Sequence, residues 1–133
     1  TRDGIAFNGD TAAANSLDDY ETGTWTPSPS SGGLSTASAT YTKVGRMVYI
    51  EYNGAFTGTR GSEQFRISGL PFTTAFWTAC SMYTQYYSQE GTEQLSGAFQ
   101  GSSTKIAFVS YGGEALGTHF SNGYLVVNGW YRI

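Results

Sequence analysis

The sequence predicts an all-β fold: an antiparallel β-sandwich of jelly-roll-like form with a short N-terminal leader. Between Tyr41 and Ile133, apolar and polar residues alternate with a period of two, as they do in half-buried strands. Glycine, with 18 residues, and clusters of Ser, Thr and Asn divide that pattern into short segments. No helical periodicity appears beyond residue 24. Many short strands joined by turn residues are typical of sandwiches and jelly rolls.

Residues 1–24 are predicted to form the leader, or neck, and residues 25–133 the head domain. The leader alternates small and polar residues and has too few apolar side chains for a core of its own. Asn15 precedes a short acidic run, a pattern typical of a helix N-cap with acids in the first turn. We therefore expect one or two helical turns from Leu17, ended by Gly23.

The head domain is expected to contain about seven successive strands. Residues 27–38 are rich in Ser, Gly and Pro and are predicted to form a loop. Pro71 lacks the N–H that a central ladder needs and marks the exit of a strand. In chain order, the strand segments are residues 41–44, 47–56, 65–67, 75–87, 95–99, 105–111 and 124–133, with 24–26 as a candidate eighth.

The alternation also assigns side chains to faces. In 47–56 the residues Val48, Ile50, Tyr52 and Phe56 share one face, and in 75–87 Phe76, Thr78, Cys80 and Met82 do so. Several large side chains fall on the face opposite their strand's main apolar set: Tyr49, Trp77, Tyr83, Tyr131 and Ile133. Covering such a second apolar surface requires another subunit, so we expect a homo-oligomer.

Connection lengths predict where the two ends of the sandwich differ. If every strand reverses direction, the short connections at Gly45, 70–74 and 101–103 share one end with the leader and Ile133. The longer polar connections at 27–38, 57–62, 88–92 and 112–123 then share the other end. Long loops presented away from the point of attachment are where binding residues concentrate.

Composition excludes several classes of function. Charged residues make up 13% of the chain, the net charge is −3, and no basic cluster occurs, so we expect no nucleic-acid partner. No apolar run approaches the length of about 18 residues that spans a bilayer, so no membrane insertion is expected. Cys80 is the only cysteine and sits in an apolar alternating run, where a thiol behaves as a small hydrophobic group.

Three segments carry a resemblance to a known family. The segment from Leu17 to Pro27 reads LDDYETGTWTP, residues 41–48 read YTKVGRMV, and residues 68–72 read SGLPF. Together they resemble the C-terminal receptor-binding domains of bacteriophage tail fibre proteins, the trimeric tips of virions. The resemblance covers the N-terminal half of the chain, and the first segment is its most specific part. It implies a parallel homotrimer, a location in the virion tail fibre and attachment to the host-cell surface.

Aromatic residues are the leading candidates for receptor contact. The chain has 10 tyrosines and 3 tryptophans on a weakly charged surface, a composition typical of recognition surfaces and suited to stacking on sugar rings. The same aromatic side chains equally suit packing between strands or subunits. The candidate receptor-binding residues are Tyr86, Tyr87 and Tyr111, with Arg60, Glu90, Glu114 and His119 as polar neighbours.

Catalysis and cofactors are not expected. A glycan-cleaving tailspike domain would need two carboxylates flanking the sugar bond, and Glu90 with Glu93 or Glu114 offers only an uninformative spacing. His119 is the single histidine, so one subunit offers no two-histidine metal site, although three copies could meet on a trimer axis. Besides a non-enzymatic receptor-binding tip and a depolymerase, a structural trimerisation or capping domain remains open.

Overall fold

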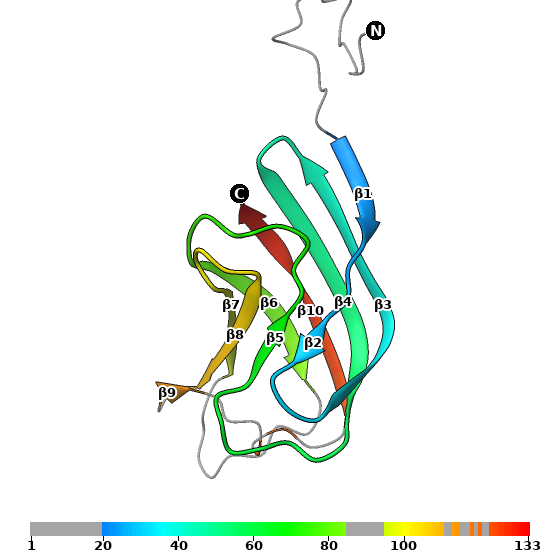
Figure 1. Ribbon diagram of the computed structural model, residues 1–133, viewed down its shortest axis with the longest axis vertical. Helices are drawn as coiled ribbons and strands as arrows, with labels where there is room; N and C mark the ends of the chain where they lie inside the picture. Colours follow the sequence, from blue (N-terminus) through cyan, green and yellow to red (C-terminus); the bar gives the residue numbers. More distant parts are fainter. Residues whose placement is uncertain (1–19, 85–94, 111–112, 115–117, 119, 121–122) are drawn as a thin grey trace, which may run out of the picture.

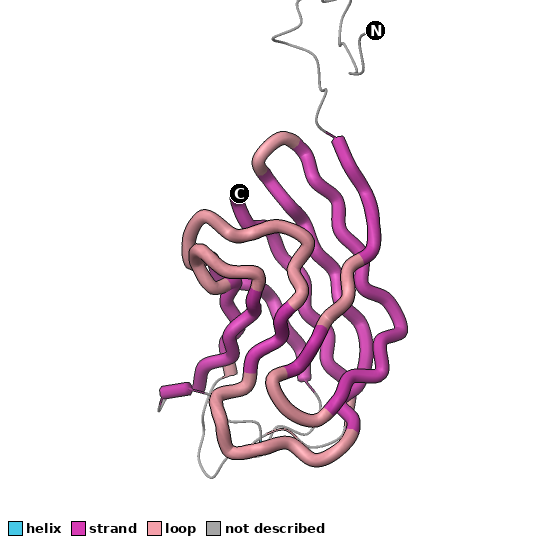
Figure 2. The backbone as a smooth tube through the Cα atoms, viewed as in Figure 1, coloured by secondary structure: helices cyan, strands magenta, loops and turns pink. Residues whose placement is uncertain are grey.

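A computed structural model describes residues 20–84, 95–110, 113–114, 118, 120 and 123–133 of the chain. The predicted all-β class is confirmed: the described residues form antiparallel strands and no helix (Figure 2). Because every backbone N–H and C=O in the interior needs a partner, the strands pair edge to edge along one continuous path, β1-β3-β4-β10-β6-β7-β8-β5-β2. That path curls into two facing layers (Figure 1).

The first sheet contains the longer strands. Its order is β1 (Tyr20–Thr24), β3 (Gly33–Val44), β4 (Met47–Thr57), β10 (Tyr124–Arg132) and β6 (Thr78–Thr84). Strands β3 and β4 form a hairpin whose pairing extends from Val44–Met47 to Gly33–Thr57. One irregularity interrupts that register, an extra residue in β3 between Thr36 and Ser38. Such a bulge bends the strand and redirects its side chains.

The second sheet is built from shorter strands. It contains β7 (Ser96–Phe99), β8 (Lys105–Ser110), β5 (Arg66–Ser68) and β2 (Ser28–Pro29), with β9 (Gly113–Glu114) added to β8. Strand β6 joins the two layers, since Ser81–Thr84 pair with β10 and Thr78–Cys80 pair with β7. At the opposite corner, the chain passes directly from β1 to β2 through Trp25. The chain therefore connects the two sheets at both lateral edges of the sandwich.

The core lies between the layers and is strongly aromatic. Strand β4 contributes Val48, Ile50, Tyr52 and Phe56, all of them at most 2% exposed, as the alternation predicted. Around the end of β4 and the start of β5, Phe56, Phe65, Phe108 and Phe120 pack with ring centroids 4.9 to 5.8 Å apart. Aromatic side chains bury about 150–250 Å² each, so this cluster supplies much of the apolar burial of the domain.

The described connections lie at the ends that the sequence predicted, but their lengths do not separate the two ends: the 69–77 connection of the upper end is no shorter than the 58–65 loop of the lower end. The predicted connections at 88–92 and most of 112–123 lie outside the described residues. All strand pairs are antiparallel, and the pairing path gives opposite directions to strands that follow each other in the chain from β2 to β9. The upper end in Figure 1 carries the start of β1, the β3–β4 turn, the 69–77 and 100–104 connections and the end of β10. The lower end carries the 30–32 turn, the 58–65 loop and the adjoining ends of β6, β8 and β10.

Two predictions for the N-terminal region are wrong. Residues 20–24 form strand β1 rather than helical turns, because all five pair with β3 and Gly23 leaves room for the ring of Tyr41. A Cβ at Gly23 would lie 2.7 Å from that ring. The predicted loop at 27–38 instead contains β2 and the first half of β3. Its polar side chains are exposed, and pairing with β4, rather than burial, holds it in the sheet.

Three side-chain assignments are corrected as well. Tyr131 is fully buried and shares the inward face of β10 with Leu125 and Val127. Ile133 packs against the core, which leaves Tyr124 and Trp130 as the exposed aromatic residues of β10. Phe76 is 66% exposed because residues 75–77 precede β6 instead of belonging to it. The outward orientation expected of Trp77 and Tyr83 is confirmed, at 60% and 59% exposure.

Candidate functional site

Most of the residues predicted to contact a receptor lie outside the described residues. These are Tyr86, Tyr87, Glu90, Tyr111 and His119. Of the remaining two, Glu114 belongs to β9, which pairs with β8 at the lower end of the sandwich. Arg60 lies in the 58–65 loop at the same end. Their assignment to receptor binding stays a prediction.

Arg60 has a structural role in its loop. Its Nε donates a hydrogen bond to the carbonyl oxygen of Phe120 at 2.8 Å, and its guanidinium also reaches the carbonyl of Gly58 at 3.3 Å. The guanidinium carbon lies 5.2 Å from the centroid of the Phe56 ring. Burial lowers the pKa of Arg60 from its ordinary value. These contacts fasten the loop over the aromatic cluster of the lower end.

The three segments that carry the family resemblance meet in space. Glu21 of the first accepts a hydrogen bond from the hydroxyl of Tyr41 in the second. The Tyr41 ring in turn meets the ring of Phe72, from the third, edge-on at 5.5 Å between centroids. The ammonium of Lys43 lies 5.8 Å from the Phe72 centroid. We call these residues, together with Trp25 and Gly69, the junction cluster.

Trp25 and Gly69 complete the junction cluster. Trp25 is 7% exposed, and its indole N–H donates to the carbonyl oxygen of Glu51 at 3.3 Å. Gly69 has a φ of +103°, and a Cβ on it would lie 2.0 Å from the carbonyl oxygen of Thr26. The three segments therefore share a structural task in this chain: their contacts hold β1, β3 and the 69–72 segment to one another.

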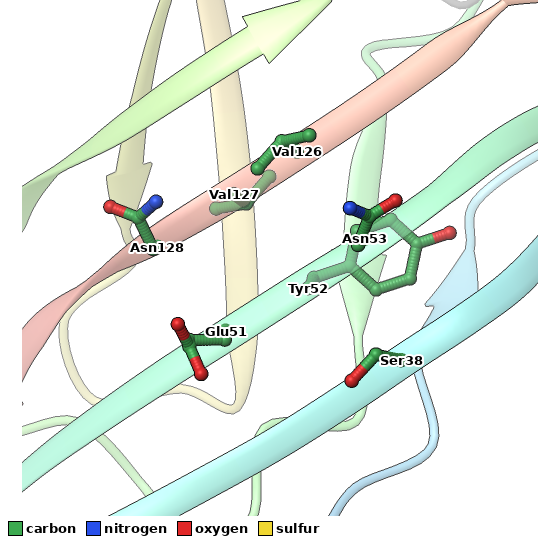
Figure 3. A pocket seen from close by; sticks show the side chains of 7 residues that line it. All are labelled: Ser38, Glu51, Tyr52, Asn53, Val126, Val127 and Asn128. Carbon is green, nitrogen blue, oxygen red and sulfur yellow. The ribbon is translucent and has the colours of Figure 1, made fainter.

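A separate hollow of about 240 Å³ lies on the outer face of the first sheet, which points away from the second sheet. Figure 3 shows the side chains around it, carried by β3, β4 and β10. Tyr52 and Val127 face the core, so the hollow meets them at their main chain. We call it the outer-face hollow; the side chains that line it are those of Ser38, Glu51, Asn53, Val126 and Asn128.

Strand register explains how these side chains come together. Glu51 pairs directly with Asn128, and Asn53 with Val126, so the four form two adjacent rows across β4 and β10. Ser38 of β3 pairs with Asn53 across the other edge of β4, directly after the β3 bulge. Directly paired residues on one face have Cβ atoms about 4.5–5.5 Å apart. Across β4 and β10 the hollow lies over two successive rows whose side chains are smaller than the aromatic pair Tyr49–Trp130 in the next row.

Aromatic side chains border the hollow on both sides. The next row along β4 and β10 pairs Tyr49 with Trp130, whose ring centroids are 5.0 Å apart, and Trp130 is 47% exposed. On β6, Tyr83 pairs with Val126 and is 59% exposed. Tyr124 lies one row beyond Val126 and is 61% exposed. A polar floor thus lies between exposed aromatic rings.

The polar groups of the hollow are unengaged within the part of the chain that the structure describes. No hydrogen bond or ion pair there involves the side chains of Ser38, Glu51, Asn53 or Asn128. The lining contains one carboxylate and no lysine or arginine. The hollow can therefore offer hydroxyl and amide donors and acceptors to a ligand.

Buried titratable groups elsewhere are structural. Burial raises the pKa of Cys80 to about 12, so its thiol stays protonated and unreactive at neutral pH. Burial likewise raises the pKa of Tyr131 to about 12. Among the described residues, no group of three His, Cys, Asp or Glu side chains is placed to hold a metal ion. A search of the same residues found no helix of the length and hydropathy needed to cross a membrane.

Sequence reasoning did not single out the outer-face hollow. The alternation in residues 47–56 puts Glu51 and Asn53 opposite the apolar face of their strand, but it indicates no role for them. The usable signal was polar residues at outward positions of two strands, flanked by outward aromatic residues. Turning that signal into a site requires knowing that β10 pairs with β4, which strand patterns alone do not specify.

With the geometry established, the chain was compared with known proteins. No family model, no curated protein and no solved structure matches it.

Proposed function

We propose that this chain is a non-enzymatic tip domain of a virion tail fibre, which assembles as a homotrimer and binds a receptor, preferably a glycan, on the host-cell surface. The resemblance of the three N-terminal segments to tail fibre domains is the starting point. The junction cluster is the observation that carries the proposal, because it gives those segments a shared task in fastening β1 to the sandwich.

The arrangement of the ends supports attachment from one side. Tyr20 and Arg132 belong to a single row of paired residues, Tyr20–Val44–Met47–Arg132, across four neighbouring strands. The preceding part of a fibre would then connect at the upper end. The lower end and the outer face stay clear for other molecules, as a tip domain requires.

Exposed apolar side chains, three of them aromatic, support assembly. Tyr20, Met47, Phe76 and Trp77 are between 41% and 66% exposed, all toward the upper end. A domain of this size gains from covering such groups with a neighbouring copy. The proposed trimer places that contact near the connection to the fibre.

Solution mass tests the assembly. We expect light scattering to give three times the chain mass of 14.3 kDa at micromolar concentration. A monomer over the whole accessible concentration range would contradict the trimer. Phe76→Ser with Trp77→Ser should shift the mass toward the monomer if the upper end forms the contact, whereas Glu63→Gln in the lower loop should leave it unchanged.

Host-cell binding tests recognition. Alanine substitution of both Tyr87 and Tyr111 should weaken adsorption to host cells while the mass stays that of the wild type. Unchanged adsorption by the folded double variant would remove these two residues from the receptor site. Absence of adsorption by the wild-type domain to any candidate host would contradict receptor binding itself.

A further inference from the structure

We propose that the outer-face hollow is a binding site for one residue of a neutral oligosaccharide, with Trp130 and Tyr83 stacking on the neighbouring sugar residues. This inference deepens the receptor-binding part of the proposed function and rests on it. It adds a binding site in the middle of a sheet to the loop residues already proposed to contact the receptor.

The shape of the hollow favours part of a chain-like ligand. Its volume of about 240 Å³ is below the range of about 300–1,000 Å³ typical of pockets that enclose a whole small molecule. It is open to solvent over the sheet, so the ligand can extend beyond it in either direction. On this face a single row, Glu51–Asn128, separates the Tyr49–Trp130 pair from the Asn53–Val126 pair, and the two pairs are about 14 Å apart along the strands.

The chemistry of the lining favours a polyhydroxylated ligand. Asn53 and Asn128 each present an amide donor and an amide acceptor, Ser38 a hydroxyl and Glu51 a carboxylate. Sugar hydroxyl groups both donate and accept, so they match this mixture. The apolar C–H faces of a pyranose ring match the exposed rings of Trp130 and Tyr83, which offer flat apolar surface at little entropic cost.

The charge of the lining favours a neutral ligand over an acidic one. Glu51 would repel a carboxylate or sulfate group, and the lining provides no cation to offset that repulsion. Among the described residues of β10, the cationic residue nearest to Asn128 is Arg132. It lies four residues further along the strand, about 13 Å away.

The same features argue against a second copy of the chain as the occupant. The core of a subunit interface is depleted of charged residues and enriched in apolar ones. Here the middle of the face holds the row Thr40–Glu51–Asn128–Ser81, which is polar across four strands. Two copies packed through this row would bury the Glu51 carboxylate without a cationic partner. The desolvation of that carboxylate would oppose association.

Ligand binding is tested first on an array that carries neutral hexose and N-acetylhexosamine oligosaccharides, with carboxylated and sulfated versions of the same backbones beside them. We expect binding to neutral oligosaccharides. Preference for the acidic versions would overturn the assignment of ligand class. Host-cell adsorption of the wild type with no array binding, and with no effect of the variants below, would overturn the site while leaving the proposed function in place.

Substitutions locate the site. Trp130→Ala and Asn128→Ala should each lower affinity for the best neutral oligosaccharide by about tenfold, equivalent to the loss of roughly one good hydrogen bond or ring contact. Glu63→Gln removes a carboxylate from the lower loop and should bind as the wild type does. Equal loss in all three variants, or none in the first two, would overturn the site.

Two further readouts separate a ligand site from a subunit contact. The chain has three tryptophans, and the indole N–H signal that disappears from the NMR spectrum of Trp130→Phe should shift on addition of the oligosaccharide. An unmoved Trp130 signal under saturating ligand would contradict the proposal. The mass of Trp130→Ala should equal that of the wild type; a smaller assembly would make this face a subunit interface and overturn the inference. If the wild type neither adsorbs to host cells nor binds to the array, that result would instead contradict the proposed function.

Discussion

At the scale of single residues, the fold depends on a few side chains in environments that only one residue type suits. Tyr131 is one of them: its ring packs on Phe99 with centroids 5.0 Å apart, and its hydroxyl accepts a hydrogen bond from the Phe72 N–H at 3.3 Å. One side chain thereby ties the core to the SGLPF segment. Strand β10 carries large residues on both faces, and alternation alone assigned Tyr131 to the outer one. Which face of β10 turns toward the core is decided by the strands that β10 pairs with.

The raised pKa of the Tyr131 hydroxyl predicts that the folded chain loses stability at alkaline pH. Burial raises its pKa to about 12 in the folded chain, above the ordinary value of 10.0, so its contribution is complete below pH 10. As pH rises further, the unfolded chain releases a proton that the folded chain retains, and stability falls by about 1 kcal/mol by pH 11. Tyr131→Phe should be less stable than the wild type at pH 7 by about 1 kcal/mol, through the lost hydrogen bond.

Urea unfolding at pH 7 and pH 11 checks this expectation. The difference between wild type and Tyr131→Phe should shrink or reverse at pH 11, because the variant has no hydroxyl to titrate at that position. Cys80 responds in the same direction, since its pKa is also raised by burial to about 12. The comparison is therefore made within a Cys80→Ala background. A constant difference at both pH values would show that Tyr131 does not titrate as proposed.

Gly69 and Gly45 form a matched pair for backbone strain. Both have positive φ, but a Cβ at Gly69 would meet the carbonyl oxygen of Thr26 at 2.0 Å, while Gly45 has nothing within 4 Å. Gly45→Ala should cost about 1 kcal/mol, from the left-handed backbone alone. Gly69→Ala should cost about 3 kcal/mol or more, because backbone must also move. Thermal unfolding of the two variants checks the order; equal losses would show that the contact with Thr26 relaxes easily.

At the scale of elements, strong alternation predicted strands well and weak alternation did not. Residues 47–56 and 124–133 were placed almost to the residue, because apolar side chains on one face mark their core orientation. Strand β1 and the first half of β3 were missed, since Ser, Thr and Gly give no burial signal. Those segments become strands through pairing with β3 and β4, a long-range effect that propensity does not contain.

Trp25 is the element-scale test of the β1–β2 corner. Its side chain is 7% exposed, packs on Tyr52 with centroids 6.1 Å apart and bonds to the Glu51 carbonyl. Trp25→Ala should lower the free energy of unfolding by about 3–5 kcal/mol, the usual cost of emptying a large buried site. Trp77→Ala, from a 60% exposed position, should change it by about 0.5 kcal/mol or less. Similar losses in both would mean that the corner does not anchor β1.

At the scale of the whole molecule, most strand neighbours are distant in sequence. Strand β10 pairs with β4 and β6, and β5 pairs with β8 across an intervening hairpin. The sequence predicted the all-β class from the alternation of apolar and polar residues, and it predicted the ends of the described connections between β2 and β8 from the reversal of successive strands. It could not predict the order of strands, and without that order neither the junction cluster nor the outer-face hollow can be assembled from their residues.

This topology predicts slow folding. Loop closure must precede most pairings, so refolding of the isolated chain should take about 10 ms to 1 s at 25 °C, as in other β-rich domains. Stopped-flow tryptophan fluorescence, dominated by burial of Trp25, would follow it at concentrations low enough to avoid assembly. Completion within microseconds would contradict the non-local order of the sheet.

The row Tyr20–Val44–Met47–Arg132 has a consequence for how such a domain can travel between proteins. Three steps between neighbouring strands separate Tyr20 from Arg132, about 14 Å. A unit whose chain arrives and leaves so close together can be spliced into a surface loop of an unrelated host, or exchanged as a cassette by recombination, with little strain on either partner. Grafting residues 20–133 into such a loop offers a direct route to displaying this sandwich on a chosen carrier.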